Sequence, residues 1–326
     1  MCIKSNEKSM KSSKIVIYLF AIFTIVSCKK DNPESIENKS NPYSCAYSII
    51  VNQNKVLISG YLSTDSKLRS KYWIDSSSAD SVAFIKSIDN GITYKEPVDE
   101  LFRKVIIHKT LNGELDVYKF NQGAMFKDEG IFCYVNNKIV RMETSGSGTI
   151  ASVCFLGDKP FFAGYFSEKG YYKSGETFFP KTPFFWDGNS SLIYLPLPDG
   201  VFFGGISCVY VDEEVYYMGG LTDFPMYWKN NELVKLSNLY GEVQQIVVSE
   251  SDVYAVGFYN KGNSNSTGHT ACYWKNKELF ELEDNAQAYG IYVDGSDIYI
   301  SGASGNVPSQ YKACYWKNGI KTDLLN

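Results

Sequence analysis

An all-β fold made of repeated small sheets is predicted by three features of the sequence. A Tyr-Trp-Lys-Asn block recurs near the C-terminus, beginning at Tyr227, Tyr273 and Tyr315. Before each copy stand two alternating segments joined by a polar turn, the second ending in glycine, for example at Gly257 and Gly302. No segment of the repeat region has the apolar period of a helix. The chain of 326 residues is 44% apolar and 15% aromatic, which is ample for a packed core and excludes a disordered chain.

The tryptophan of the repeat, or the residue that replaces it, defines six units. It falls at Trp73, Val135, Trp186, Trp228, Trp274 and Trp316. Each unit is interpreted as four short strands, a to d, with residues that accept positive φ in the c–d turn. The adjacent Tyr and Trp of strand c point to opposite faces of the sheet, so both faces need to be covered.

Sheets that are buried on both faces cannot complete their cores alone, whereas a ring of such sheets covers every face. The sequence therefore predicts a β-propeller of six four-stranded blades over residues 44–326. A seventh blade is an alternative if residues 76–104 form a degenerate unit. An open β-solenoid and two packed sandwiches are the alternatives to a ring. Because the chain begins with strand a and ends with strand d, we expect the first and last blades to close the ring by packing face to face. The alternative is that residues 43–46 are borrowed as a strand by the last blade.

An export segment precedes the repeats. The apolar run 15–26 follows a basic stretch and is short for a membrane span, which is typical of a signal peptide. It ends in Ile-Val-Ser-Cys, with the cysteine at Cys28, and this ending resembles the lipobox of bacterial lipoproteins. The resemblance implies a signal peptide over residues 1–27, cleavage before Cys28, and acyl chains such as palmitate on Cys28 that anchor the protein in a membrane.

Residues 28–43 are polar and are interpreted as a flexible tether between the anchor and the propeller. The lipobox resemblance implies a location in the bacterial cell envelope. Lys29 follows Cys28 where an Asp would favour the inner membrane, so we expect the outer membrane, and the sequence does not distinguish its periplasmic from its surface face. The net charge of −4 and the lack of a basic cluster argue against a nucleic-acid partner.

Ser87, Asp89, Gly91 and Thr93 resemble the Asp-box, S-x-D-x-G-x-T-W, with Tyr94 in place of the tryptophan. In propellers of the sialidase type this motif forms a turn between strands c and d, in which the Asp side chain accepts backbone N–H groups. The resemblance therefore implies a structural turn and no activity.

The cysteines and histidines do not point to a metal site or a disulfide framework. Cys133, Cys272 and Cys314 occupy the same repeat position, far apart in a ring, so we expect buried thiols. The two histidines, His108 and His269, lie in separate units and cannot form a zinc site. We expect no catalytic residue, no metal and no cofactor.

The long b–c loop of the third unit is the candidate binding element. Its aromatic residues are Tyr165, Tyr171, Tyr172, Phe178 and Phe179. Exposed aromatic side chains beside polar ones suit a sugar or a peptide. The alternative is that they pack onto the rim of their own blade.

Roughly residues 45–326 resemble exported bacterial lipoproteins with tandem Tyr-Trp-Lys-Asn-Gly propeller repeats, clearly in the last three units and weakly in the second. That resemblance implies fold and location, and it carries no catalytic residue. The sequence favours a non-catalytic binding or scaffold protein with a glycan, peptide or protein partner. The alternatives are a propeller-type hydrolase or lyase acting on glycans or lactones, which should gather two carboxylates or a metal at the mouth of the channel, and a purely structural envelope component.

Overall fold

The computed structural model describes residues 42–64, 67–89, 92–96, 104–120, 131–142, 147–167, 171–173, 176–178, 181–188, 192–198, 204–221, 224–262 and 268–325. All of them belong to one compact unit, Lys39–Asn326. The predicted signal peptide, Cys28 and nearly all of the predicted tether lie outside the described residues. Within the described ranges, no helix is long and apolar enough to cross a membrane.

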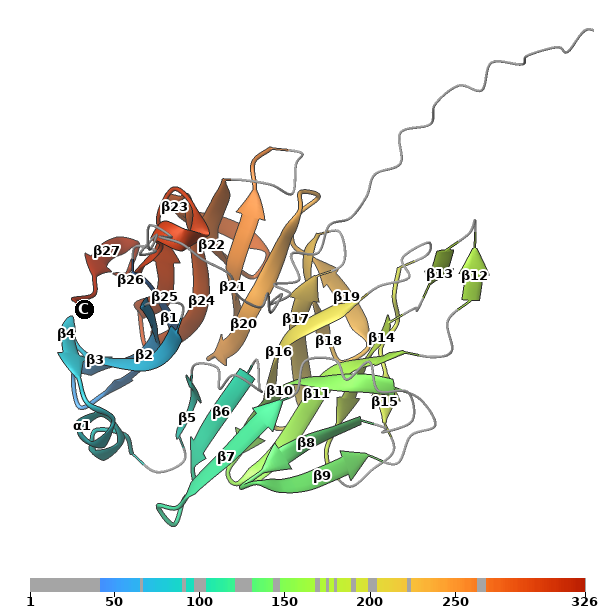
Figure 1. The fold of residues 1–326 in the computed structure, drawn as a ribbon. Helices are drawn as coiled ribbons and strands as arrows, with labels where there is room; N and C mark the ends of the chain where they lie inside the picture. The colour runs from blue at the N-terminus through green and yellow to red at the C-terminus, as the bar shows by residue number, and fades with distance from the viewer. Residues whose placement is uncertain are drawn as a thin grey trace, which may run out of the picture. The chain divides into compact units, whose positions relative to one another are not determined.

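Antiparallel sheets of consecutive strands follow one another along this unit, and each sheet is one blade (Figure 1). Blade 1 contains β1 (Tyr43–Asn52), β2 (Lys55–Thr64), β3 (Lys67–Ile74) and β4 (Ser77–Ala79). Blade 3 contains β10 (Ser147–Leu156), β11 (Lys159–Ser167), β14 (Lys181–Trp186) and β15 (Ile193–Tyr194). Blade 4 contains β16 (Gly205–Asp212), β17 (Val215–Leu221), β18 (Pro225–Lys229) and β19 (Glu232–Lys235). Blade 5 contains β20 (Gly241–Ser249), β21 (Asp252–Asn260), β22 (His269–Lys275) and β23 (Glu278–Asp284). Blade 6 contains β24 (Ala286–Asp294), β25 (Asp297–Ser304), β26 (Lys312–Lys317) and β27 (Ile320–Asp323).

Blade 2 has a fifth strand. Its strands are β5 (Ile92–Glu96), β6 (Lys104–Lys109), β7 (Leu115–Phe120), β8 (Ile131–Val135) and β9 (Lys138–Met142), paired in that order. The last four match the repeat, and β5 is additional. The six predicted blades are thus confirmed, with one strand more in blade 2 than predicted. The described residues between 76 and 96 contribute β4, a short helix and β5, and they form no seventh sheet.

Three short elements lie between strands. The helix α1 (Ser81–Lys86), which the sequence analysis did not predict, links β4 to β5, and the Asp80 side chain caps it by accepting from Ala83 N–H at 2.8 Å. The 3₁₀ turn η1 (Pro308–Gln310) precedes β26. β12 (Tyr171–Lys173) and β13 (Glu176–Phe178) pair as a hairpin in the b–c loop of blade 3.

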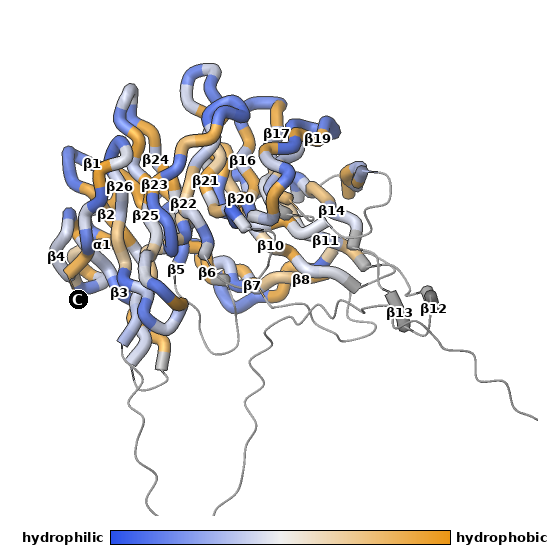
Figure 2. Tube along the Cα trace, turned by 90° about the horizontal axis from the view of Figure 1, so that it is seen from above, coloured by the Kyte–Doolittle hydropathy of each residue, from blue (hydrophilic) through white to orange (hydrophobic). Residues whose placement is uncertain are grey.

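Large side chains on strand c build the cores between blades. Trp228 packs with buried residues of blades 3 and 4, whereas its neighbour Tyr227 packs between blades 4 and 5. Apolar clusters of this kind fill every junction of consecutive blades, including that of blade 6 with blade 1. The apolar residues follow the strands while the turns are hydrophilic (Figure 2). The prediction that both faces of each sheet are covered is confirmed, and the ring excludes the solenoid and the sandwiches.

The ring closes by contact between the faces of its first and last blades. β1 to β4 form one sheet and β24 to β27 form another, with no strand exchanged. Ser44 joins them, because its N–H donates to Tyr311 O at 2.8 Å and its Oγ accepts from Ala313 N–H at 2.9 Å. Trp73 Nε1 adds a hydrogen bond of 2.8 Å to Leu325 O. The closure expected from the order of the strands is therefore the one observed.

A glycine in strand b and a β-bulge in strand a occur together in the five four-stranded blades. The pairing of strands a and b shifts by one residue after Ala46, Ile150, Ile206, Val243 and Ala288. These residues pair with Gly60, Gly164, Gly220, Gly257 and Gly302, respectively. A Cβ on Gly257 would lie 1.9 Å from Glu242 O, and the other four glycines are blocked by strand a in the same way. The glycine of the repeat is therefore required because the bulged strand leaves no room for a side chain.

Blade 2 has neither the glycine nor the bulge. β6 and β7 pair without a shift from Lys104 to Lys109. The inner edge of β6 in turn pairs with β5 from Val105 to Lys109. Because a bulge bends and twists the edge of a strand, the straight edge of β6 is better suited to accept a further strand. Thr93 Oγ1 and His108 Nδ1, 3.1 Å apart, add a side-chain hydrogen bond between the two strands.

The residues that resemble an Asp-box lie at this departure from the repeat. Ser87 is the C-cap of α1, Asp89 is exposed two residues later, and Thr93 lies in β5. Gly91 lies outside the described residues. The segment joins a helix to β5, whereas the resemblance implies a turn from strand c to strand d. The physical reason is that the strand after the motif pairs with the later strand β6, so the Asp-box interpretation is not confirmed.

Candidate functional site

Side chains from five blades approach one another on the inner strands of the ring, near the end that carries the b–c loops. We call this group the central cluster. Its members are Cys45, Tyr47 and Tyr61 of blade 1, Lys95 of blade 2, Ser207 of blade 4, Glu242 of blade 5 and Tyr289 of blade 6. In blades 1, 4 and 6 one contributed residue (Tyr47, Ser207 and Tyr289, respectively) is the one that the bulge inserts. The repeat glycine is thus connected with the site, because it pairs with the residue just before the one that the bulge inserts.

Lys95 is the residue that the extra strand β5 brings to the cluster. Its Nζ donates to Tyr289 O at 3.5 Å, and its own carbonyl accepts from Ser59 Oγ at 2.6 Å. Burial lowers the pKa of the Lys95 amine, and the charges of Cys208 and Glu242 act in the opposite direction. One lysine of blade 2 therefore interacts with groups of blades 1, 4, 5 and 6.

Three tyrosines form the aromatic part of the cluster. The ring centroid of Tyr47 lies 4.7 Å from that of Tyr289 and 5.3 Å from that of Tyr61. Burial raises the pKa of all three phenols above the ordinary tyrosine value. They are consequently protonated at neutral pH, so they can donate hydrogen bonds and do not serve as bases.

Cys45 lies among these tyrosines and is 1% exposed. Burial raises the pKa of its thiol to about 12, although hydrogen bonds with the side chains of Tyr61 and Tyr289 act to lower it. A protonated, buried thiol is a poor nucleophile. None of the six described cysteines is in a disulfide, and the predicted buried thiols are observed at Cys133, Cys272 and Cys314.

Ser207 and Glu242 complete the cluster on the side of blades 4 and 5. Ser207 Oγ donates a hydrogen bond to Glu242 Oε1, which links the innermost strands of these two blades. The negative charge of Glu242 acts on the amine of Lys95. The cluster therefore combines one amine, one carboxylate and several protonated hydroxyl groups, a set that binds polar ligands through hydrogen bonds and charge.

Both histidines have structural partners outside the cluster. His108 is fully buried, and besides Thr93 it contacts Asp158 of blade 3, with Nε2 3.1 Å from Oδ1. His269 Nδ1 forms a hydrogen bond with Gln287 Nε2, and burial lowers the pKa of the imidazole. Over the described ranges, no three His, Cys, Asp or Glu side chains are grouped so as to hold a metal ion.

The aromatic residues predicted to bind a ligand lie on and beside the β12–β13 hairpin. Tyr165 is half-buried in β11, Tyr171 and Tyr172 are in β12, and Phe178 is in β13. Phe179 lies outside the described residues. The backbone register places Tyr171 opposite Phe178. The loop thus contains a regular hairpin, and its role in binding stays a prediction.

The central cluster was not predicted from the sequence. Lys95 follows the residues that resemble an Asp-box, and no role was predicted for it. Tyr289 alternates with Ile291 and Val293 in the sequence, which predicts a common face, but the register shift after Ala288 places Tyr289 in a different cluster from these two residues. A usable signal existed, because a strand-b glycine that recurs at a fixed place marks a close approach of strand a.

Comparison with known proteins does not assign the chain to a family. No protein-family model matches the chain, and no curated protein matches it. Among solved structures, the Pyrococcus horikoshii acylaminoacyl peptidase is similar at 11% identity with a TM-score of 0.45, over 87% of this chain and 52% of the peptidase. The β-propeller domain of the Trilobed protease from Pyrococcus furiosus, described as having an open velcro topology, is similar at 9% identity with a TM-score of 0.43, over 87% of this chain and 96% of that domain. The computationally designed Ika8 protein is similar at 11% identity with a TM-score of 0.32, over 86% of this chain and 74% of that one.

The chain thus spans about half the length of the peptidase that it matches. At these identities and TM-scores the likenesses say nothing about activity, and the fold is assigned from the blades of the protein itself.

Proposed function

We propose that the protein is a lipid-anchored protein of the bacterial envelope whose propeller binds, without catalysis, a glycan or peptide that carries a carboxylate. The binding elements are the central cluster and the β12–β13 hairpin of blade 3. The acyl chains on Cys28 hold the protein at the outer membrane, and residues 28–42 form the tether, since Tyr43 begins β1.

The position of Lys95 is the observation that carries this proposal. Lys95 is half-buried, and even partial withdrawal of an amine from water is costly unless something compensates the charge. Among the described residues, the hydrogen bond of Lys95 Nζ is the long one to Tyr289 O, so N–H groups are available for a ligand. A ligand carboxylate would give a charge-assisted hydrogen bond there.

The surrounding groups support binding more than hydrolysis. The tyrosine hydroxyls can donate to a hydroxylated or carboxylated ligand, and tyrosine rings are suited to contact sugar rings. The thiol of Cys45 and the phenols are held in their protonated forms, which disfavours a nucleophilic mechanism through them.

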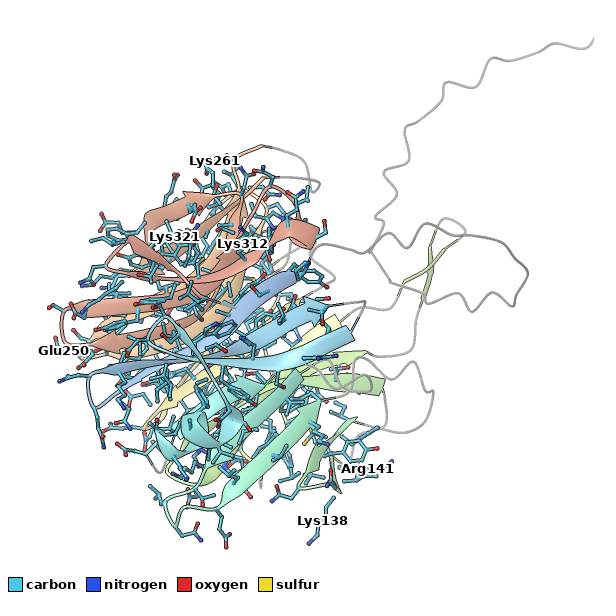
Figure 3. All side chains as sticks on the ribbon, turned by 60° about the vertical axis from the view of Figure 1, so that its left-hand side comes forward. Lys138, Arg141, Glu250, Lys261, Lys312 and Lys321 are labelled. Atoms are coloured by element: carbon cyan, nitrogen blue, oxygen red, sulfur yellow. The ribbon has the colours of Figure 1, made fainter. Side chains whose placement is uncertain are left out.

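A binding screen with paired lysine variants tests the site. The full-length protein is presented to an array of neutral and acidic oligosaccharides and short peptides, beside Lys95→Met and Lys138→Met. Lys138 is an exposed residue of the same blade (Figure 3). We expect carboxylate-bearing hits that weaken at least tenfold in Lys95→Met and are unchanged in Lys138→Met. A wild-type protein that gives no hit, or hits that do not respond to Lys95→Met, would contradict the proposal.

The anchor is tested separately in cells fed an alkyne-bearing fatty acid. We expect the wild-type protein and Cys2→Ser to be labelled and to sediment with membranes. Cys28→Ser should lose the label. Equal labelling of Cys28→Ser and the wild type would show that Cys28 is not the acylated residue.

A further inference from the structure

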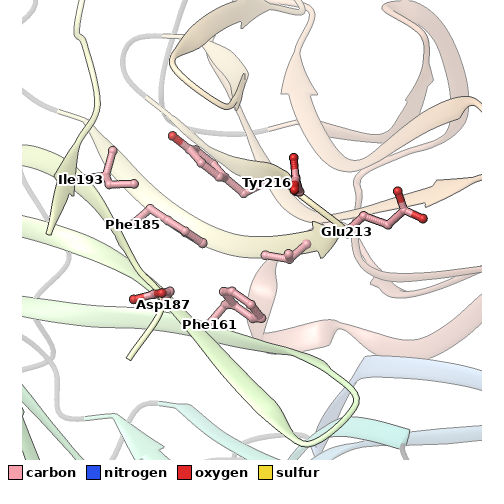
Figure 4. Close-up of a pocket in the computed structure, with 8 residues that line it drawn as sticks. Phe161, Phe185, Asp187, Ile193, Glu213 and Tyr216 are labelled. Atoms are coloured by element: carbon pink, nitrogen blue, oxygen red, sulfur yellow. The ribbon is translucent and has the colours of Figure 1, made fainter. Parts of the chain in front are cut away.

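A second region with the character of a binding site lies at the opposite end of the blades, between blades 3 and 4 (Figure 4). It is a groove with a volume of about 230 Å³. Its lining comes from strands of both blades, from the a–b turn of blade 4, and from Asp187, which follows strand c of blade 3. The central cluster lies toward the other end of the same strands, so the two regions are separate.

Aromatic rings form one wall of this groove. The rings of Phe185 and Tyr216 are stacked across the junction of the blades, with centroids 4.3 Å apart and an interplanar angle of 13°. Phe161 continues the row, 5.9 Å from Phe185. Tyr216 is fixed by its hydroxyl, which donates to Asn231 Oδ1 at 3.0 Å. The wall is therefore aromatic, and Tyr216 is held in it by both its ring and its hydroxyl.

Acidic side chains form the rim. Glu213 and Glu214 make up the turn between β16 and β17, and both are exposed. Within the described residues, neither forms an ion pair with a basic side chain. Asp187 lies on the other side, with Oδ2 3.6 Å from Lys159 Nζ. An apolar wall with a negative rim is complementary to a group that has an apolar body and a positive end.

The chain itself provides an example of such a group at one end of the groove. Lys159 Nζ lies 4.8 Å from the centroid of the Phe161 ring and is paired with Asp187. This arrangement combines a cation–π contact with a carboxylate. The remaining part of the groove, between Tyr216 and the two glutamates, also places an aromatic ring beside carboxylates. No described basic side chain lies on that part.

We propose that this groove binds the side chain of a lysine or arginine from a basic segment of a protein partner. Its volume is below the roughly 300–1,000 Å³ of sites for whole small molecules, and it suits one long side chain. The methylene stem packs on the rings while the charged end reaches Glu213 and Glu214. The net charge of −4 favours the approach of a basic partner.

Labelled pentapeptides with one central basic residue test this site on the full-length protein at low salt. Fluorescence anisotropy compares peptides whose central residue is lysine, acetyl-lysine or diaminopropionic acid, the last of which keeps the charge and loses most of the stem. We expect the lysine peptide to bind, and the other two to bind at least tenfold more weakly. Equal binding of lysine and acetyl-lysine would overturn the proposal. Equal binding of the lysine and diaminopropionic acid peptides would contradict the proposed packing of the methylene stem on the aromatic rings.

Matched charge variants locate the binding. Glu213 (Figure 4) and Glu250 (Figure 3) occupy the same position of the a–b turn in blades 4 and 5, with φ of 50° and 58°, and both are exposed. The double variant Glu213→Gln, Glu214→Gln should weaken binding of the lysine peptide at least tenfold, whereas Glu250→Gln should leave it unchanged. Equal loss in both would mean a non-specific attraction to the acidic surface and would overturn the site. This test does not involve Lys95, so its outcome neither supports nor contradicts the proposed function.

Discussion

Blades 2 and 5 follow the same repeat and differ at the edge that faces the centre of the ring. In blade 5, Gly257 lies against the bulged strand β20, and no described strand pairs beyond that edge. In blade 2 the glycine and the bulge are absent, and β5 pairs with the straight edge of β6. Among the described blades, the one without the glycine and the bulge is the one with a fifth strand. The comparison also shows that the one blade which departs from the repeat supplies the amine of the central cluster.

The largest expected effect comes from filling the space that the repeat glycine leaves. Gly257→Ala would place a Cβ 1.9 Å from Glu242 O, and backbone atoms on both sides have to move. We expect a loss of about 3 kcal/mol in the free energy of unfolding, measured by urea denaturation. The matched control is Gly262→Ala in the same blade, where no atom lies within 4 Å of the new Cβ. If both variants are equally stable, the link between glycine and bulge is wrong.

The closing junction can be compared with an internal one through two tryptophans. Trp73 Nε1 donates to Leu325 O across the junction of blades 1 and 6, and Trp228 Nε1 donates at the same 2.8 Å to Pro196 O across that of blades 3 and 4. Trp274 Nε1, by contrast, is buried with no hydrogen-bond partner among the described residues. The closure thus uses a contact that also occurs inside the ring.

Replacing each indole by phenyl separates that hydrogen bond from the loss of volume. Trp73→Phe and Trp274→Phe both remove part of a fully buried ring, but only the first removes a hydrogen bond. We therefore expect Trp73→Phe to lower the free energy of unfolding by about 1 kcal/mol more than Trp274→Phe does. Chemical denaturation of both variants measures the difference, and the reverse order would show that the contact to Leu325 does not stabilise the closure.

A smaller effect is expected where β5 is attached to β6. Thr93→Val keeps the shape of the side chain and removes its hydrogen bond with His108. We expect a loss of about 0.5 kcal/mol and faster amide hydrogen exchange in β5. Thr322→Val in the outer strand β27 is the control. Unchanged exchange in β5 would mean that backbone pairing alone holds the strand.

The fold was largely predictable because its signal is repeated. Adjacent Tyr and Trp in strand c require cover on both faces, and Trp228 and Tyr227 have it. The site was not predictable in the same way. β5 occurs once, and its partner β6 is recognised only from pairing that the repeat does not contain. α1 is six residues long, too short to show a helical period. The bulges were not predicted, because an inserted residue such as Tyr289 changes the alternation of the strand at a single position.

The pH dependence of stability in Lys95→Met tests the central claim most directly. Burial lowers the pKa of Lys95 in the folded protein, so the unfolded chain binds more protons below the ordinary lysine pKa, and wild-type stability rises with pH in that range. Met has similar length and no charge. We predict that Lys95→Met melts at a higher temperature than the wild type at pH 7, that the gap narrows toward pH 10, and that Lys138→Met shows neither effect. A Lys95→Met protein that melts below the wild type at pH 7, or a gap that does not change with pH, would contradict the placement of this amine at the centre of the ring.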